Sequence, residues 1–351
     1  MSAAGALAAM VEDSSIVVCC GSGGVGKTTT AAAIAVEGAR RGRRSCVVTI
    51  DPAKRLADAL GLASLSNVAT RVEGDWSGDL HALMLDTKST FDSLVARYAA
   101  TEEQARLILA NRLYRNISGA LSGTQEYMAM EKLYELAAEG GFDLIVVDTP
   151  PTRNALDFLD APRRLTRFLD NPIFKVLTMP TRAYLKALSM ATQTFLRTVS
   201  RVVGGEVVAD AVAFFQAFEG MEQGFRDRAA EMLELLSAPQ TAFVLVSSPR
   251  REAVEEAGFF AQKLAESDLG VHALVINRLH PSFGTAPVAE GLGDLSRNLA
   301  DFRAMANQEE QHFDELVRRV APAPVGRVPL LVADVHDLAA LIEVGGYLFS
   351  T

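Results

Sequence analysis

Short apolar runs alternate with helical stretches along most of this chain. Most of these runs are rich in Val, Ile or Leu and end at Gly or a polar residue, which is typical of strands buried on both faces. The predicted strands are Ile16–Cys20, Ser45–Ile50, His81–Asp86, Asp143–Asp148, Thr241–Ser247 and Val271–Asn277. A last short strand is expected to end at Val328, before a helix from about Val335. This alternation predicts an α/β fold with a doubly wound, mainly parallel sheet.

Two long blocks, 89–138 and 161–236, interrupt this pattern. Both are mostly helical in their spacing and contain no convincing strand. In the second block apolar residues recur at helical intervals: Tyr184, Leu188, Ala191, Phe195, Val199 and Val202. We therefore predict a single domain over residues 1–351, with a helical subdomain inserted at about 89–138 and 161–236.

Composition narrows the class of protein. Of the 351 residues 49% are hydrophobic and 22% are charged, which is the balance of an ordinary globular chain. The net charge of −9 argues against generic nucleic-acid binding, which depends on neutralising phosphates. The three cysteines (Cys19, Cys20 and Cys46) lie inside apolar runs. The sequence predicts neither a signal peptide nor a membrane span. A cytoplasmic protein without a specific nucleic-acid partner is expected.

The segment Gly21–Thr28 reads Gly-Ser-Gly-Gly-Val-Gly-Lys-Thr and matches the phosphate-loop pattern G-x-x-x-x-G-K-[ST]. It lies between a predicted strand and a predicted helix, Lys27–Arg41, as a true phosphate loop does. Glycines let backbone N–H groups converge on phosphate, and the helix N-terminus adds positive potential. Lys27 should reach the β and γ phosphates of a nucleotide, and Thr28 should ligate Mg²⁺. The predicted nucleotide-binding residues of this loop are Gly23, Gly24, Val25, Gly26, Lys27, Thr28 and Thr29.

Two acidic residues suggest hydrolysis. Asp51 and Asp148 follow predicted strands, and ligands of open parallel sheets bind at the carboxyl ends of strands. Asp148 would hold Mg²⁺ through water, and Asp51 would orient or deprotonate the attacking water. Phosphoryl transfer needs mainly positioning and charge neutralisation, so these few groups suffice. The alternative for each aspartate is that it only caps the next helix.

Three blocks of the sequence resemble the arsenite-pump ATPase family: Gly21–Thr30, Thr49–Ala53 and Val147–Thr152. This family belongs to the deviant-Walker P-loop ATPases, as do the ParA and MinD partitioning proteins, and it includes the ATPase that delivers tail-anchored membrane proteins. Further similar blocks are Gly123–Glu126, Val275–Leu279 and Val328–Leu330, so that the likeness covers about residues 14–345. The uninterrupted strings at 49–57 and 123–133 look most like the bacterial anion-transporting ATPase branch.

The resemblance implies roles for particular residues. Asp51 would be the catalytic aspartate of switch I, and Asp148 the aspartate of switch II. Asn277 would read the adenine, and Pro329 would lie near the base. Members of the family act as dimers that close over two ATP molecules and open after hydrolysis.

Three departures from the family pattern bear on function. Ser22 stands where the family has a signature lysine, which crosses the dimer interface to the phosphates of the partner. Either another cation replaces it, or this chain pairs with a related ATPase that carries the lysine. The Cys-x-x-Cys zinc motif of the targeting ATPase and the thiolates that bind arsenite are absent from the sequence, and we do not expect arsenite transport.

The segment from Asn171 to Gly205 contains five basic residues and no acidic residue. A basic amphipathic surface of this kind suits a hydrophobic client or an anionic membrane, which would place the protein peripherally at the membrane. The alternative is an ordinary helix that packs its apolar stripe inward and leaves its basic residues in solvent.

The leading hypothesis is therefore a dimeric Mg²⁺-dependent ATPase that couples ATP hydrolysis to binding a protein or hydrophobic client. One alternative is a regulatory subunit of a heterodimer that binds nucleotide with negligible turnover. Another is a partitioning or membrane-positioning ATPase, which the lack of a basic C-terminal tail disfavours, since Arg327 is the last Lys or Arg.

Overall fold

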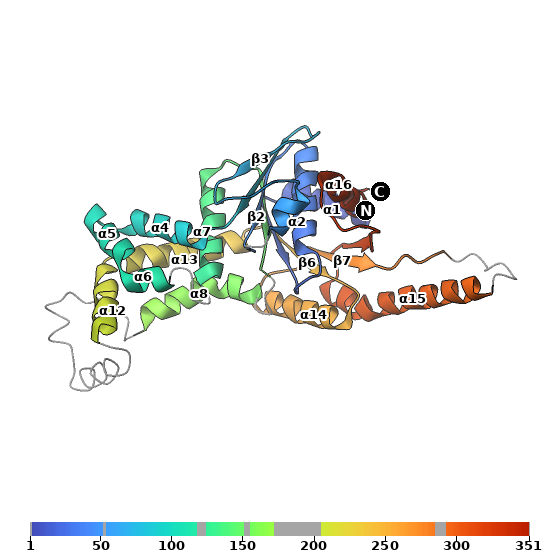
Figure 1. Cartoon of the computed structure of the whole chain (residues 1–351). Coiled ribbons are helices and arrows are strands. Elements are labelled where there is room, and N and C mark those ends of the chain that lie inside the picture. The colour runs from blue at the N-terminus through green and yellow to red at the C-terminus, as the bar shows by residue number, and fades with distance from the viewer. Residues whose placement is uncertain are drawn as a thin grey trace. The chain divides into compact units, whose positions relative to one another are not determined.

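The chain forms two compact units (Figure 1). The computed structural model describes residues 2–51, 54–117, 124–150, 155–171, 205–284 and 293–350. The sheet unit comprises Met1–Leu85, Glu135–Leu156 and Ser237–Thr351, and the helical unit comprises Asp86–Tyr134 and Asp157–Leu236. The helical unit overlaps the two blocks, 89–138 and 161–236, that the sequence predicts as an insertion.

The sheet unit is built on an eight-stranded sheet in the order β3-β4-β2-β5-β1-β6-β7-β8. Its strands are β1 (Ile16–Cys20), β2 (Arg44–Thr49), β3 (Thr70–Val72), β4 (Asp79–Met84), β5 (Leu144–Asp148), β6 (Thr241–Ser247), β7 (Ala273–Leu279) and β8 (Val325–Pro329). β3 pairs antiparallel with β4, and the other neighbouring strands run parallel. The predicted α/β class with a doubly wound, mainly parallel sheet is confirmed.

Two strands, β4 and β7, end two residues away from their predicted ends. β4 ends at Met84, two residues before the predicted end, because the Asp86 side chain accepts a hydrogen bond from the Ser89 N–H and caps the following helix. β7 continues to Leu279, two residues beyond the predicted end. The sequence pattern does not predict β3, because its three residues carry too little periodicity to be recognised.

Helices cover both faces of this sheet. They are α1 (Ala3–Asp13), α2 (Lys27–Arg40), α3 (Arg55–Ala59), α14 (Arg251–Glu266), α15 (Asp294–Val320) and α16 (Leu338–Phe349). The chain leaves β1 and β6 in opposite directions along the sheet, so right-handed crossovers place α2 and α14 on opposite faces. α1 and α16 pack with α2, whereas α15 packs with α14 (Figure 1).

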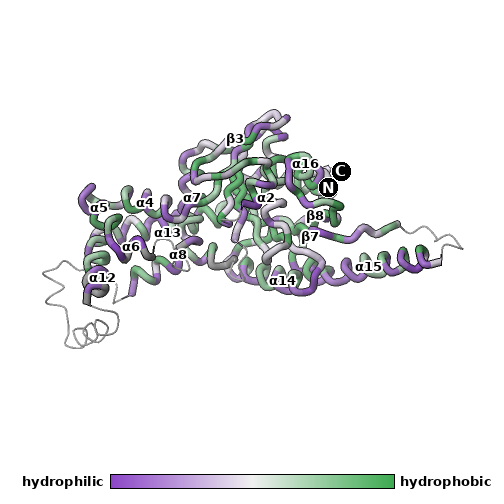
Figure 2. Tube along the Cα trace, viewed as in Figure 1, coloured by the Kyte–Doolittle hydropathy of each residue, from purple (hydrophilic) through white to green (hydrophobic). Residues whose placement is uncertain are grey.

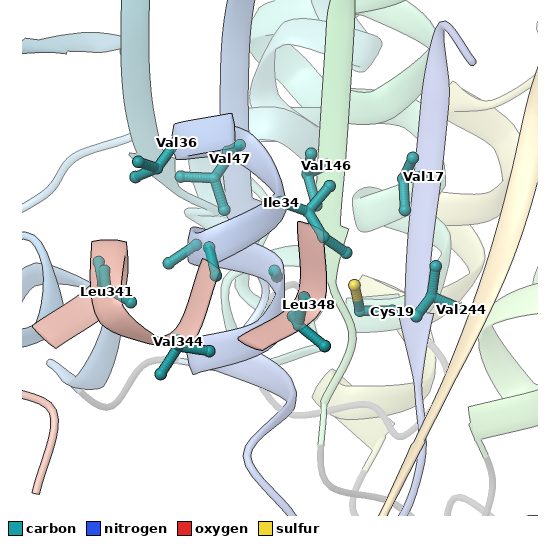
Figure 3. Close-up of a cluster of buried hydrophobic side chains, with 14 of the residues drawn as sticks. Val17, Cys19, Ile34, Val36, Val47, Val146, Val244, Leu341, Val344 and Leu348 are labelled. Carbon is teal, nitrogen blue, oxygen red and sulfur yellow. The ribbon is translucent and has the colours of Figure 1, made fainter. Parts of the chain in front are cut away.

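The main core lies between the sheet and the layer of α2 and α16. Alternate strand residues point toward this layer, because successive side chains of a strand face opposite sides. Figure 3 shows the side chains that meet there: Val17, Cys19, Val47, Val146 and Val244 from strands, Ile34 and Val36 from α2, and Leu341, Val344 and Leu348 from α16. Figure 2 colours the central strands largely as hydrophobic and much of α15 as hydrophilic. This core holds the carboxyl ends of β1, β2 and β5 in register beside the start of α2.

The described part of the helical unit consists of helices. They are α4 (Thr87–Tyr98), α5 (Glu102–Ala110), α6 (Arg112–Ile117), α7 (Thr124–Glu139), α8 (Ala155–Asp170), α12 (Gly205–Ala217) and α13 (Glu222–Ser237). The ends of α7 and α8 extend into the sheet unit. Inside the helical unit the buried Arg228 guanidinium lies 3.2 Å from Glu131 and stacks on the Tyr134 ring at 3.9 Å. Nearly all of the basic segment, residues 172–204, falls outside the described residues.

Candidate functional site

The predicted phosphate loop joins β1 to α2 at the carboxyl edge of the sheet. Gly21, Gly24 and Gly26 all have positive φ angles, and the Gly26 φ of +95° is a left-handed conformation that side chains rarely adopt. A Cβ on Gly26 would lie 2.0 Å from the Asn277 amide nitrogen, and one on Gly21 would lie 2.1 Å from the Val246 carbonyl oxygen. The loop therefore needs glycine for its backbone conformation and for its close approach to neighbouring strands.

Lys27 is the first residue of α2 and is 5% exposed. Its Nζ donates a hydrogen bond to the Ser22 carbonyl oxygen at 2.8 Å, so the ammonium lies against the loop itself. Burial lowers the pKa of Lys27, and the nearby Asp148 carboxylate opposes that shift. A buried cation held against a glycine-rich loop is an arrangement that suits an anionic phosphate group.

Asp148 ends β5 and is 1% exposed. Its Oδ2 accepts hydrogen bonds from the Thr28 hydroxyl at 2.7 Å and the Thr49 hydroxyl at 2.9 Å. Its Oδ1 is buried and has no hydrogen-bond partner. Burial raises the pKa of Asp148 to about 6, although both hydroxyls and Lys27 favour the carboxylate. The structure thus brings Thr28 and Asp148 together and adds Thr49, which the sequence motifs do not single out.

Asp51 lies two residues beyond the end of β2 and faces a cleft of about 490 Å³. Its carboxylate is 3.7 Å from the Arg55 guanidinium. The predicted site residues that line this cleft are Gly24, Gly26, Lys27, Thr28, Thr29, Asp51, Asn277 and Pro329. Gly23 and Val25 line an adjoining cleft of about 430 Å³, together with Ser22. One edge of the sheet therefore gathers residues that are far apart in the sequence.

β7 reaches the loop through two consecutive side chains. Asn277 Nδ2 donates to the Val25 carbonyl oxygen at 2.9 Å, and Arg278 Nη1 donates to the Gly24 carbonyl oxygen at 2.9 Å. The adenine-reading role of Asn277 stays a prediction, because its amide NH₂ contacts the loop here. Arg278 was not predicted as a site residue, although its position directly after Asn277 was the signal that could have identified it.

The donor atoms of the site fit a magnesium nucleotide. Mg²⁺ prefers oxygen ligands and is often bound by one or two protein oxygens together with substrate phosphates. The Thr28 hydroxyl and the buried, partner-free Oδ1 of Asp148 are oxygen atoms of that kind. Within the described residues, no three His, Cys, Asp or Glu side chains gather into a site that would hold a metal by protein ligands alone. Thr28 and Asp148 are the residues that would hold Mg²⁺ here.

The sequence is similar to known proteins over most of its length. The profile of the anion-transporting ATPase family matches residues 14–350. The chain is 24% identical over 307 residues to the ATPase get3 of Aspergillus terreus, covering 87% of this chain and 81% of that protein. It is 23% identical over 316 residues to the ATPase GET3 of Podospora anserina, with the same coverage of both chains. Because the family profile spans nearly the whole sequence, this chain belongs to the anion-transporting ATPase family.

Proposed function

We propose that this protein is a Mg²⁺-dependent ATPase that acts as a dimeric nucleotide switch. The observation that carries the proposal is the hydrogen-bonded set of Thr28, Asp148 and Thr49 beneath a phosphate loop whose lysine is buried. Family membership and relatives named as ATPases support the same activity. The substrate is ATP, and the products are ADP and phosphate.

Each residue has a distinct task in this proposal. The loop from Gly23 to Gly26 offers backbone N–H groups to phosphate, and Lys27 adds its positive charge. Thr28 and Asp148 would hold Mg²⁺, which neutralises phosphate charge when it is bound. Asp51 orients the attacking water or accepts its proton, since Asp51 lines the same cleft as Lys27 and Thr28.

Dimerisation and client binding extend the proposal. The partner would be a second copy of the chain or a related ATPase that carries the signature lysine missing at Ser22. The client would be a protein or hydrophobic molecule that the helical unit binds. ATP would control this binding because its affinity for the closed dimer differs from its affinity for the open dimer. No described helix combines the length and apolar character needed to cross a bilayer. The three buried cysteines form no disulfide, which agrees with a cytoplasmic location, with or without peripheral membrane contact.

Steady-state Mg²⁺-ATP hydrolysis by the purified chain tests this function, with Asp51→Asn as the blank. Turnover clearly above the blank is the expected result, because Asn cannot accept the water's proton. Retained turnover in Asp51→Asn would refute the role of this residue.

A second candidate is a regulatory subunit that binds ATP without hydrolysing it. The serine at position 22 favours this candidate, since no side-chain charge is available there. Tight ATP binding without turnover by the isolated chain would support it. Recovery of turnover on mixing with a related ATPase that carries the lysine would identify a heterodimer.

A further inference from the structure

The backbone of β7 is distorted where it meets the phosphate loop. The register between β7 and β8 shifts between Ile276 and Leu279, so the two residues between them leave the regular ladder. Arg278 adopts a φ of +63°, a left-handed conformation, and its N–H donates to the Asn277 side-chain oxygen at 2.9 Å. Bulges beside functional sites redirect side chains, and a strained non-glycine residue persists where the surrounding structure holds it. Here the distortion directs Asn277 and Arg278 onto the loop.

The cationic groups of Arg278 and Lys27 contact neighbouring parts of the phosphate loop. The guanidinium donates to the Gly24 carbonyl oxygen at 2.9 Å, and the Lys27 ammonium donates to the Ser22 carbonyl oxygen at 2.8 Å. Both cations therefore rest on carbonyl oxygens that are two residues apart. Arg278 lines the 490 Å³ cleft with Lys27 and also the 430 Å³ cleft with Ser22. The β and γ phosphates are expected in this region, because the phosphate-loop lysine, Lys27, contacts them.

The other arginine of the larger cleft is engaged differently. Arg55 lies 3.7 Å from the Asp51 carboxylate, and this charge pair offsets part of its positive potential. Arg278 instead contacts a neutral carbonyl and is exposed. A guanidinium binds phosphate with two parallel, charge-assisted hydrogen bonds, which are stronger than a bond to a carbonyl. A phosphate that enters the cleft would therefore compete successfully for this side chain.

We propose that Arg278 turns from the Gly24 carbonyl to the γ-phosphate of bound ATP, and that it supplies from within the same chain a cation that distinguishes ATP from ADP. This inference rests on the proposed nucleotide binding. It makes Arg278 a specificity-determining residue. Although Ser22 replaces the signature lysine, recognition of the terminal phosphate would then need no lysine from a partner.

The test measures the affinities of a non-hydrolysable ATP analogue and of ADP, both with Mg²⁺. Arg278→Gln should weaken the analogue about tenfold and leave ADP within about twofold, because only the analogue carries the terminal phosphate. Arg278→Lys should keep an intermediate preference, since it retains the charge without the guanidinium fork. Arg318→Gln is the matched control, because Arg318 is also exposed and donates to a backbone carbonyl, that of Asp314, outside both clefts. It should bind both nucleotides as the wild type does.

Several results would overturn this inference. Equal weakening of ADP and the analogue would show that Arg278 only braces the loop. An unchanged Arg278→Gln protein, a wild type without preference for the analogue, or a lysine variant as impaired as the glutamine variant would contradict the charge-based account. Failure of the proposed function would give a different result. If the wild type prefers the ATP analogue through Arg278 but hydrolyses ATP no faster than Asp51→Asn, the ATPase proposal is refuted and the role of Arg278 stands.

Discussion

Asp148→Asn tests the electrostatics of the site in the absence of nucleotide and Mg²⁺. The carboxylate is 1% exposed, and burial raises its pKa from the ordinary 3.8 to about 6. Keeping it ionised in the folded chain therefore costs about 3 kcal/mol more than in the unfolded chain. Well above pH 6 the carboxyl is ionised in both the folded and the unfolded state, and the folded protein bears this whole cost. As the pH falls through 6 the folded state takes up a proton first and becomes relatively more stable.

The difference in free energy of unfolding between wild type and Asp148→Asn isolates this effect. It should shift in favour of the wild type by about 1 kcal/mol between pH 8 and pH 5, because the variant lacks the carboxyl group at position 148. Urea denaturation at the two pH values measures the difference. Asp75→Asn, an exposed aspartate of the same unit, controls for the loss of one negative charge. A difference that stays constant, or that moves in favour of the variant on acidification, would refute the reasoning.

The same carboxylate couples pH to ligand binding. The carboxylate that would hold Mg²⁺ through water must be ionised to do so, and the affinity for Mg²⁺-ATP should therefore fall as the pH drops below about 6. Binding measured by calorimetry should lose this dependence in Asp148→Asn, which should bind weakly at every pH. Equal affinity of the wild type at pH 5 and pH 8 would contradict the role of Asp148.

Three further changes test other parts of the structure. Lys27→Ala should abolish ATP binding, because it removes the buried cation from the phosphate loop, and an unchanged affinity in a nucleotide-binding assay would contradict the site. Gly26→Ala should destabilise the folded chain by about 1–2 kcal/mol and weaken ATP binding, since its φ is +95° and the new Cβ would meet the Asn277 amide. Wild-type stability in urea and wild-type affinity would show that the loop tolerates the side chain. Arg228→Met should cost about 3 kcal/mol in denaturation experiments, because it leaves the Glu131 charge buried; a loss below about 1 kcal/mol would indicate that solvent reaches that carboxylate.

Local sequence signals determined the elements that carry the site. The apolar runs at 16–20 and 241–247 predicted the two strands whose bounds the structure reproduces. The phosphate-loop pattern placed the start of α2 at Lys27, where the structure has it. Such features depend on neighbours in the chain, namely apolar periodicity, glycine spacing and the residue that follows a strand, so they can be read without tertiary information.

Interactions between distant segments were decided only by the tertiary structure. The register of β2 against β5 pairs Thr49 with Asp148 and brings the Thr49 hydroxyl onto the carboxylate. The shift between β7 and β8 aims Arg278 at Gly24, which precedes it by more than 250 residues. Register, bulges and burial arise from the packing of whole strands and helices, and no local pattern encodes them. The sequence by itself therefore determined which residues form a phosphate-binding loop, whereas the fold determined which other groups surround it and how far burial raises the pKa of Asp148.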